Sequence, residues 1–492
     1  MSKNHDLALL IRSHIPIIVI ETHEERRVID MLCELAIELS KPIFHWTITQ
    51  GLQRCDVDYP PQKHNSQPDE VLKHIKASQQ NAIYVMADFH PYLTDPINVR
   101  LLKDIALDFP VYQTTMILIS HKLEIPGEIQ KFSARYDMAL PDRDELEKLV
   151  HSIADEWRAR HPGRQVRTDR KTLNALLRNL SGLTRRDSQR LIRNAIYDDG
   201  AITQEDLPKV MEAKYRLLNS DGVLAFEYET ADFVDVGGLK NLKSWLQHRK
   251  AAFHGEPVAK GLDTPKGILL LGVQGCGKSL AARAIAGIWN VPLLRLDFGT
   301  LYNKYHGETE RNLRESLNTA EIMAPCVLWM DEIEKGIADG GEDGGTSRRV
   351  LGTLLTWMAE KKAPVFMVAT ANDIERLPPE LVRKGRFDEI FFVDLPDRET
   401  RALIFTIHLQ RRDIDPTGIN IAELAILSDG FSGSEIEQAI VSALYSAHAQ
   451  QQSLSTAIIA DEIAKTRPLS VVMAEKVAYL RDWARERTVP SD

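Results

Sequence analysis

The run GVQGCGKS at residues 272–279 constrains the fold of this chain more than any other feature. It follows a short apolar segment, 267–271, and precedes an apolar helical run, 280–289. It therefore fits the pattern G-x-x-x-x-G-K-[ST] between a strand and a helix, in which the glycines let backbone N–H groups point at phosphate oxygens. The following helix adds the positive end of its dipole. The sequence thus predicts a phosphate-binding loop in an α/β fold.

Residues of this loop are the first candidates for a nucleotide site. Lys278 is expected to reach the β and γ phosphates of ATP, and Ser279 to ligate Mg²⁺. Cys276 is either a small side chain at a tolerant position or a thiol whose oxidation would block ATP. The residues predicted to bind nucleotide are Gly272, Val273, Gln274, Gly275, Cys276, Gly277, Lys278, Ser279 and Leu280. The expected cofactors are ATP and Mg²⁺.

Two further apolar segments end in residues that ATP hydrolysis requires. The run CVLWMDE, 326–332, places Asp331 where it would complete the Mg²⁺ shell, and Glu332 where it would orient and deprotonate the attacking water. The next strand, 364–372, ends at Asn372, which either holds that water or the γ-phosphate or only ends the strand. Together with the loop, these segments predict an ATPase that converts ATP and water to ADP and phosphate.

Three segments resemble the AAA family: FVDVGGLK at 233–240, the stretch 381–408 that contains RKGRFDEIFF, and LSDGFSGSEIEQAI at 427–440. The resemblance implies a P-loop AAA+ module with a parallel sheet and flanking helices over 233–400. It also implies an α-helical lid over 401–470.

The AAA resemblance also implies roles for individual residues. Arg383 and Arg386 match the paired arginines that the family inserts into a neighbour's ATP site, which implies a homo-oligomeric ring, usually of six subunits. Surface arginines without that role are the alternative. The residues implied to surround adenine are Asp235, Val236, Gly237, His408, Gly433 and Ser434.

The segment YNKYHGETER, 302–311, occupies the place where the family has a pore loop. Tyr305 would be the pore aromatic, with His306 and Gly307 beside it. An ordinary loop tyrosine is the alternative. His306 replaces the more apolar residue that many unfoldases carry, which weakens the case for strong gripping of a substrate.

The N-terminal half repeats the order of elements found in the C-terminal half. Apolar segments at 15–22, 82–89 and 114–120 are followed by LPDRDELEKLV, which is similar to LPDRETRALIF at 395–405. We therefore predict a degenerate AAA-like α/β domain over 1–150. A lid-like helical region over 151–215 and a linker over 216–232 are expected to follow. An unrelated α/β domain is the alternative.

The N-terminal module is not expected to hydrolyse ATP. Where a phosphate loop belongs, the chain reads IETHEERR, which has no glycine and carries Glu21, Glu24 and Glu25, whose charges would repel phosphate. Asp88 follows the second apolar segment, but Phe89 replaces the catalytic acid. The chemistry of these residues argues against catalysis there.

The cysteines, histidines and apolar runs of the chain give no sign of a zinc site, a disulfide framework or a membrane span. The four cysteines form no CxxC pair, and the 15 histidines show no ligand spacing, so neither a zinc site nor a disulfide framework is indicated. No apolar run reaches the roughly 18 residues that a spanning helix needs. A cytoplasmic protein without a membrane partner is expected.

One stretch is strongly basic, although the chain as a whole carries a net charge of −9. Residues 157–194 hold eleven Lys and Arg against two Asp, a local charge of +9. This stretch is either a surface for nucleic acid, an interface to an acidic partner, or a solvated face.

The whole arrangement resembles the cyanobacterial and algal-chloroplast family known as hypothetical chloroplast reading frame forty-six. The likeness rests on an inactive module, one active module with GVQGCGKS, and a C-terminal helix and tail, 471–492, that contains WARERTVP. It implies an ATPase, located in the chloroplast stroma if the chain comes from an algal plastid.

Three functions are compatible with these features. The first is a Mg-dependent AAA+ ATP hydrolase whose ring remodels or translocates a macromolecular client, with a protein as the expected client. The second is a nucleic-acid-dependent ATPase that uses the stretch 157–194. The third is a nucleotide-controlled assembly switch or scaffold, whose ring forms with ATP and relaxes with ADP.

Overall fold

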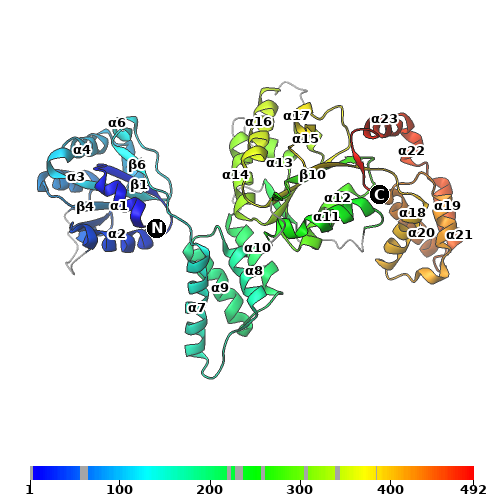
Figure 1. Cartoon of the computed structure of the whole chain (residues 1–492), viewed down its shortest axis with the longest axis horizontal. Coiled ribbons are helices and arrows are strands. Elements are labelled where there is room, and N and C mark those ends of the chain that lie inside the picture. The colour runs from blue at the N-terminus through cyan, green and yellow to red at the C-terminus, as the bar shows by residue number, and fades with distance from the viewer. Residues whose placement is uncertain are drawn as a thin grey trace. The chain divides into compact units, whose positions relative to one another are not determined.

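The computed structural model describes residues 4–55, 65–218, 223–227, 236–255, 261–303, 309–337, 344–383 and 385–492. The chain divides into two compact units, Met1–Leu146 with Thr184–Gln189, and Glu147–Leu183 with Arg190–Asp492. Figure 1 labels many of the helices and some of the strands of both.

The first unit is built on a six-stranded sheet with the order β3-β2-β4-β5-β1-β6. All neighbours are parallel except β2 and β3. The strands are β1 Ile17–Glu21, β2 Ile43–Thr47, β3 Gly51–Arg54, β4 Ile83–Ala87, β5 Thr115–Ser120 and β6 Ser133–Arg135. The central strands β4 and β5 are buried along their whole length, as expected when helices cover both faces of a parallel sheet.

Two hydrophobic clusters lie on the two faces of this sheet. One contains apolar side chains of α1 and α2, and the other contains those of α3 and α4. The helices of this part are α1 Asn4–Arg12, α2 Glu25–Leu39, α3 Pro68–Ser78, α4 Pro96–Leu107, α5 Phe109–Tyr112 and α6 Gly127–Gln130.

The second unit contains a seven-stranded sheet with the order β15-β14-β10-β13-β12-β11-β9. Only β9 runs antiparallel to its neighbour. The strands are β9 Leu224–Glu227, β10 Gly267–Gly272, β11 Leu293–Leu296, β12 Cys326–Met330, β13 Val365–Ala371, β14 Glu389–Val393 and β15 Val489–Pro490. The strand β9 lies within 216–232, so part of the segment expected as a linker pairs with the sheet edge.

Helices cover both faces of the second sheet as well. The cluster on one face contains α11 and α12, and the larger cluster on the other face contains α13 to α17. Their bounds are α11 Lys240–Phe253, α12 Lys278–Trp289, α13 Phe298–Asn303, α14 Thr309–Ile322, α15 Ile333–Ile337, α16 Gly344–Glu360 and α17 Pro379–Val382.

The two sheets share the order of five parallel strands. In the first sheet these strands, taken in chain order, lie side by side as 5-1-4-3-2, with the antiparallel β3 at the edge beside strand 2. The strands β10 to β14 of the second sheet repeat this order, with the antiparallel β9 beside β11 and an additional parallel strand, β15, beside β14. The internal repeat expected from the sequence is therefore present in the folded chain. The predicted fold class is confirmed: an AAA+ module preceded by a second AAA-like α/β module.

Four helices connect the two sheets in sequence: α7 Arg143–Arg160, α8 Arg170–Leu180, α9 Arg185–Asp199 and α10 Asp206–Leu218. Within the second unit, Lys214 of α10 is fully buried, and its Nζ donates to the carbonyls of Ser181 and Ile322, both at 2.6 Å. Burial lowers the pKa of Lys214 to about 8. The lysine joins α10 and the end of α8 to the end of α14.

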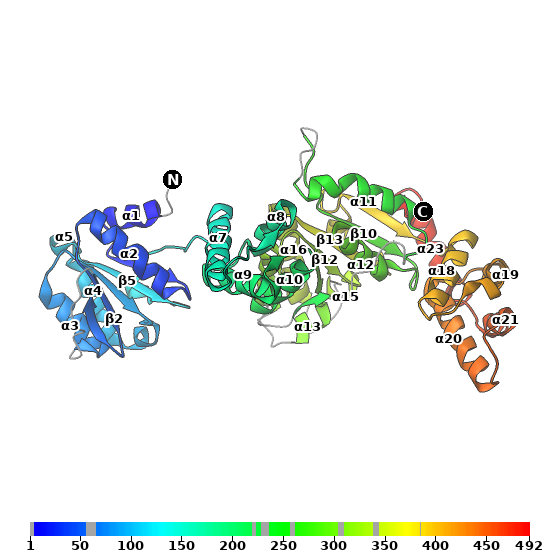
Figure 2. The same ribbon diagram turned by 90° about the horizontal axis from the view of Figure 1, so that it is seen from below.

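A separate helical subdomain follows the second sheet, and Figures 1 and 2 both show it at one side of the unit. Its helices are α18 Arg398–Gln410, α19 Ile421–Leu427, α20 Gly433–Ala449 and α21 Thr456–Lys465. A capping box between Ser432 and Glu435 begins α20. This subdomain has its own core around Phe405 and Ile440.

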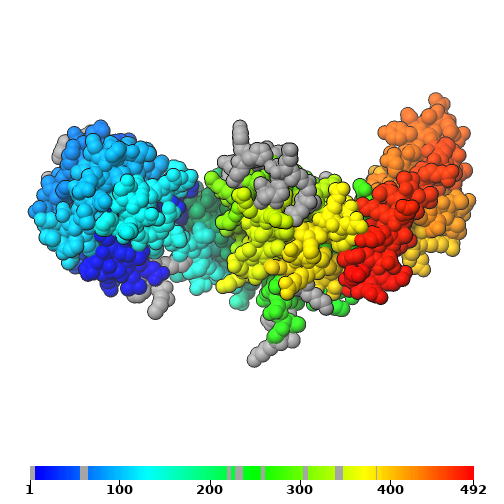
Figure 3. Space-filling view, turned by 90° about the horizontal axis from the view of Figure 1, so that it is seen from above, coloured from blue at the N-terminus to red at the C-terminus, as the bar shows by residue number. Residues whose placement is uncertain are grey.

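The C-terminal segment returns to the second sheet. After α22 Leu469–Val472, the helix α23 Ala474–Ala484 buries Leu480 and Ala484 in the core of the large subdomain. The strand β15 then pairs with β14, and Ser491 O accepts from the N–H groups of Asn241 and Leu242. Figure 3 shows this red segment lying against the yellow part of the same unit. Among the residues that the structure describes, no helix meets the length and apolarity needed to cross a membrane.

Candidate nucleotide-binding site

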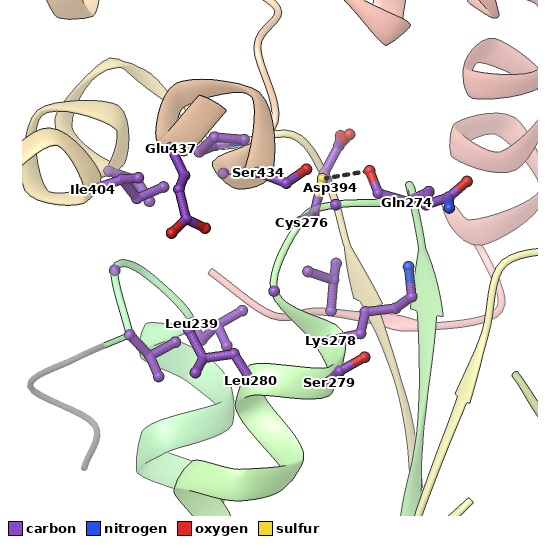
Figure 4. Close-up of a pocket in the computed structure, with 18 of the residues that line it drawn as sticks. Leu239, Gln274, Cys276, Lys278, Ser279, Leu280, Asp394, Ile404, Ser434 and Glu437 are labelled. Atoms are coloured by element: carbon purple, nitrogen blue, oxygen red, sulfur yellow. Dashed lines mark hydrogen bonds between the residues drawn. The ribbon is translucent and has the colours of Figure 1, made fainter. Parts of the chain in front are cut away.

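A cavity of about 420 Å³ opens where the second sheet meets the helical subdomain (Figure 4). Its walls come from the loop after β10, the ends of β12 and β13, the segment before α11, and the helices α18 and α20. The sequence-predicted residues that line it are Val236, Gly237, Gln274, Gly275, Cys276, Gly277, Lys278, Ser279, Leu280, Asp331, Glu332, Asn372, His408, Gly433 and Ser434. Segments that are nearly 200 residues apart in the sequence thus meet at one cavity.

The glycines of the loop are needed for close approach. Gly275 has φ +80°, and a Cβ there would lie 2.2 Å from Ser434 Oγ on the helical subdomain. A Cβ on Gly272 would lie 2.0 Å from Val393 O. Neither position can carry a side chain without displacing its neighbour, so the loop can pass between β14 and α20 only with glycine.

Lys278 lies buried beneath the loop, with 6% of its surface exposed. Its Nζ donates to the carbonyls of Gly272 at 2.9 Å and Val273 at 2.8 Å. Burial lowers the pKa of Lys278 to about 8, although the carboxylates of Glu334, Asp331 and Glu332 oppose the shift. The ammonium group is held by the backbone at the base of the cavity.

This burial predicts that nucleotide affinity depends on pH. Phosphates bind the charged form of Lys278, so a bound nucleotide should raise the pKa of this lysine. ATP affinity should then stay level below about pH 8 and fall by up to roughly tenfold per pH unit above it. Equilibrium titration with a non-hydrolysable ATP analogue would measure this dependence. Lys278→Arg, which keeps its charge throughout, is the control, and a level wild-type affinity to about pH 9.5 would contradict the assignment.

Cys276 lines the cavity as a protonated thiol. Burial raises its pKa to about 12, and its Sγ lies 4.0 Å from Gln274 O, the contact dashed in Figure 4. A thiol activated by the helix N-terminus would show the opposite shift.

Oxygen ligands suitable for Mg²⁺ meet where the start of α12 faces the end of β12. Ser279 Oγ donates to Asp331 Oδ1 at 3.2 Å, and Thr370 Oγ1 donates to the same oxygen at 2.5 Å. Hydroxyl and carboxylate oxygens are the donors that Mg²⁺ takes from proteins beside a nucleotide. The residues present therefore fit the ion.

Glu332 is held by the end of β13. Its backbone N–H donates to Thr370 Oγ1 at 3.0 Å, and its Oε1 accepts from Asn372 Nδ2 at 2.9 Å. Lys335 forms an ion pair with Glu332 Oε2. The carboxylate thus has a fixed place next to the Mg²⁺ ligand, with an amide beside it.

Glu334 is a third acid that was not singled out in the sequence. It is buried, its Oε1 accepts from Asn372 N at 2.9 Å, and burial raises its pKa. Its role is to hold the backbone of Asn372 in place. In the run MDEIE, nothing in the sequence separates Glu334 from an exposed acid. Its burial follows from the packing of α15 on β13.

On the side of the cavity away from Lys278, Figure 4 shows Leu239 and Leu280 next to each other and Ile404 across from them, with the carboxylate of Glu437 nearby. His408 Nδ1 lies 3.5 Å from Glu437 Oε1, and burial lowers the pKa of His408. Such a surface suits the flat, largely apolar face of a purine. Other lining residues absent from the sequence prediction are Leu239, Thr370, Val393, Asp394, Pro396, Thr400, Ile404, Ile407, Arg411, Glu437 and Asp492.

The remaining predicted residues lie elsewhere. Gly272 and Val273 do not line the cavity, but their carbonyls accept from Lys278 Nζ. Arg383 is exposed, Arg386 donates to Leu355 O, and neither lines the cavity of its own subunit. Asp235, Tyr305, His306 and Gly307 fall outside the described residues.

Comparison with known proteins agrees with this geometry. Residues 268–395 match the family model described as "ATPase family associated with various cellular activities (AAA)". Residues 3–138 and 144–221 match the models for the N-terminal and second domains of SpoVK-like AAA ATPases.

Relatives extend the likeness over the whole chain. The chain is 37% identical to the AAA domain-containing protein ycf46 of Pyropia yezoensis over 491 residues, 98% of each protein. It is 35% identical to ycf46 of Trieres chinensis, over 98% of this chain and 97% of that one. The human ATPase family gene 2 protein homolog A shares 33% identity over 225 residues, 43% of this chain and 25% of that protein.

Proposed function

The chain belongs to the ycf46 family of AAA domain-containing proteins, and from that premise we propose that it hydrolyses Mg·ATP to drive work on a protein client. One observation carries the proposal. A buried lysine, a serine–aspartate pair and a glutamate beside an asparagine surround the same cavity, each held by hydrogen bonds. These are the groups that phosphoryl transfer to water requires.

Each side chain then has one task. Lys278 would exchange the loop carbonyls for the β and γ phosphates. Ser279 and Asp331 would hold Mg²⁺, which would neutralise phosphate charge. Glu332 accepts the proton of the attacking water, and Asn372 keeps that carboxylate in place. The loop N–H groups and the start of α12 bind the remaining phosphate charge.

The exposed position of Arg383 supports an assembly of several subunits. An arginine that stabilises the transition state must reach the γ-phosphate, and Arg383 does not line the cavity of its own chain. A neighbouring subunit would supply it, and head-to-tail contacts of this kind close into a ring. We expect six subunits by likeness to the family.

The proposal is tested by assaying the ATPase of the purified full chain with and without unfolded protein, RNA and DNA. Hydrolysis stimulated by unfolded protein supports a remodelling machine. Stimulation by nucleic acid alone supports the second function below. A folded sample that neither binds nor hydrolyses ATP at millimolar Mg·ATP rules out the assignment of the site.

Tyr305 is the residue through which we expect a client to be gripped. Tyr305→Ala should leave basal ATPase nearly unchanged and abolish the stimulation by an unfolded protein. Tyr445→Ala is the matched control, because Tyr445 is an exposed tyrosine on α20 that lies outside the cavity. Unchanged stimulation in the Tyr305 variant would contradict a pore-loop role.

A nucleic-acid-dependent ATPase is the second candidate, favoured by the exposure of the basic stretch 157–194. All eleven of its lysines and arginines are exposed, and two of them, Arg158 and Arg193, form ion pairs with Asp155 and Glu156. Binding of RNA or DNA that weakens with salt, and is lost when several of these arginines become serine, would support this function.

A further inference from the structure

Three histidines and an aspartate gather at one edge of the first sheet. His23 follows β1, Asp88 and His90 follow β4, and His121 follows β5. The strands β4, β5 and β1 are parallel neighbours, so the segments after their carboxyl ends meet at the same edge. Residues up to 98 positions apart in the sequence, His23 and His121, are brought together by topology alone.

The ligand atoms of Asp88, His90 and His121 all lie within 4.8 Å of one another. In a tetrahedral zinc site, ligand atoms about 2 Å from the ion are roughly 3.3 Å apart. Asp88 and His121 are exposed and His90 is half-buried, so small side-chain rotations can close the difference. We propose that these three residues bind a divalent transition-metal ion, with Zn²⁺ as the ion of best fit.

Ser120 orients two of the three ligands. Its Oγ lies 2.7 Å from His90 Nδ1 and 3.4 Å from Asp88 Oδ1. When the His90 Nδ1–H donates to this hydroxyl and the hydroxyl donates to Asp88, the lone pair of His90 Nε2 is directed away from the serine and is available to an ion. Metal-binding histidines in proteins are held by a hydrogen bond of this kind at the other ring nitrogen.

Two further imidazole contacts complete the cluster. The rings of His90 and His121 meet edge to face, with centroids 4.8 Å apart and planes at 87°. The ring of His23 stacks on His121 at 5.9 Å and 19°. The three-residue site therefore has a third imidazole, that of His23, within reach as a fourth ligand, or leaves a coordination position for water or for a partner's side chain.

The neighbouring acids do not compete for the ion. Glu21 Oε1 accepts from Leu123 N at 2.9 Å and from Arg135 at 3.0 Å. Glu24 forms an ion pair with Arg27 at 2.8 Å. Their charges are offset by these partners, and Asp88 is the carboxylate that faces the histidines.

The corresponding edge of the second sheet explains why this position suits a cation. Ala87 pairs with Ile119 as Met330 pairs with Ala369, so Asp88 and Ser120 occupy the register positions of Asp331 and Thr370. The hydroxyl-to-carboxylate hydrogen bond is the same in both. In the first sheet, histidines lie beside this edge in place of a phosphate loop. Their imidazole nitrogens favour Zn²⁺ over Mg²⁺.

The test is a Zn²⁺ titration of the nucleotide-free, chelator-treated full chain in competition with a chromophoric chelator. Co²⁺ substituted for Zn²⁺ reports nitrogen coordination through its visible absorption. We expect one ion for each chain at this site. His121→Ala and Asp88→Asn should each weaken binding by well over tenfold, and Ser120→Ala by roughly 10- to 100-fold through positioning.

Two variants serve as controls. His448→Ala removes an exposed histidine of α20, and Asp331→Asn removes the metal ligand of the ATP site, so neither should alter Zn²⁺ binding at the first sheet. Affinity and cobalt spectrum unchanged in both His121→Ala and Asp88→Asn would overturn the proposal. So would a wild-type protein that binds no Zn²⁺ at about 100 µM, a concentration well above the affinity expected for such ligands.

Discussion

Replacing Glu332 with glutamine should lower steady-state ATP hydrolysis by roughly 10²- to 10⁴-fold, the usual contribution of a general base. The amide matches the carboxylate in shape, so its oxygen can still accept from Asn372 Nδ2, but it cannot take the proton of the attacking water. ATP affinity should be retained because the contacts of Lys278, Ser279 and Asp331 do not involve Glu332. The variant should therefore trap bound ATP and the assembled ring.

Nucleotide content after gel filtration, together with mass in ATP and in ADP, measures both outcomes. Glu360→Gln is the matched control, because Glu360 is an exposed acid at the end of α16. This variant should hydrolyse ATP as the wild type does. Lys278→Ala is the opposite comparison, since it removes the buried cation and should lose nucleotide binding altogether. Appreciable turnover by the Glu332→Gln protein would show that another group is the base.

The residues of the ATP site that could be predicted are those whose chemistry is carried by a local pattern. Gly275, Lys278 and Ser279 stand in one loop, and Asp331 and Glu332 end one strand. Their relative positions follow from parallel strands ending at one edge of a sheet, which holds for any fold of this class.

Residues that act across segments could not be predicted in the same way. Thr370 contacts Asp331 because β12 and β13 pair in a particular register. Glu437 and Asp492 line the cavity only because α20 and the segment after β15 return to it. The strand β15 spans two residues, which are too few to show an alternation of apolar and polar residues. Its pairing with β14 therefore depends on the tertiary structure and not on a local sequence pattern.

The N-terminal half illustrates both outcomes. Its repeated order of elements predicted the topology, which the sheet confirms. Its histidines showed no ligand spacing, since His90 and His121 are 31 residues apart. Spacing rules apply to ligands on one helix or loop, whereas a site assembled from the ends of neighbouring parallel strands has no signature in sequence distance.

Arg383→Ala should reduce hydrolysis by about 10³-fold or more with little change in ATP affinity, because an arginine supplied to the γ-phosphate acts mainly on the transition state. Arg386 is a less clean test, since it also donates to Leu355 O within its own subunit. If Arg383 acts across the interface, its loss disables the site of the adjacent subunit and leaves its own Lys278, Asp331 and Glu332 intact.

Mixing two inactive proteins distinguishes this arrangement from an arginine that acts in its own subunit. When Arg383→Ala and Glu332→Gln subunits exchange freely at equal amounts, about a quarter of head-to-tail interfaces pair an intact site with an intact arginine. Hydrolysis should therefore recover to roughly that fraction of the wild-type rate. Lys278→Ala mixed with Glu332→Gln is the matched control, because every site then carries a defect and no interface can recover. If subunits exchange in the first mixture but ATP hydrolysis does not recover, Arg383 acts within its own chain. The case for a ring whose ATP sites are shared between neighbouring subunits would then be lost.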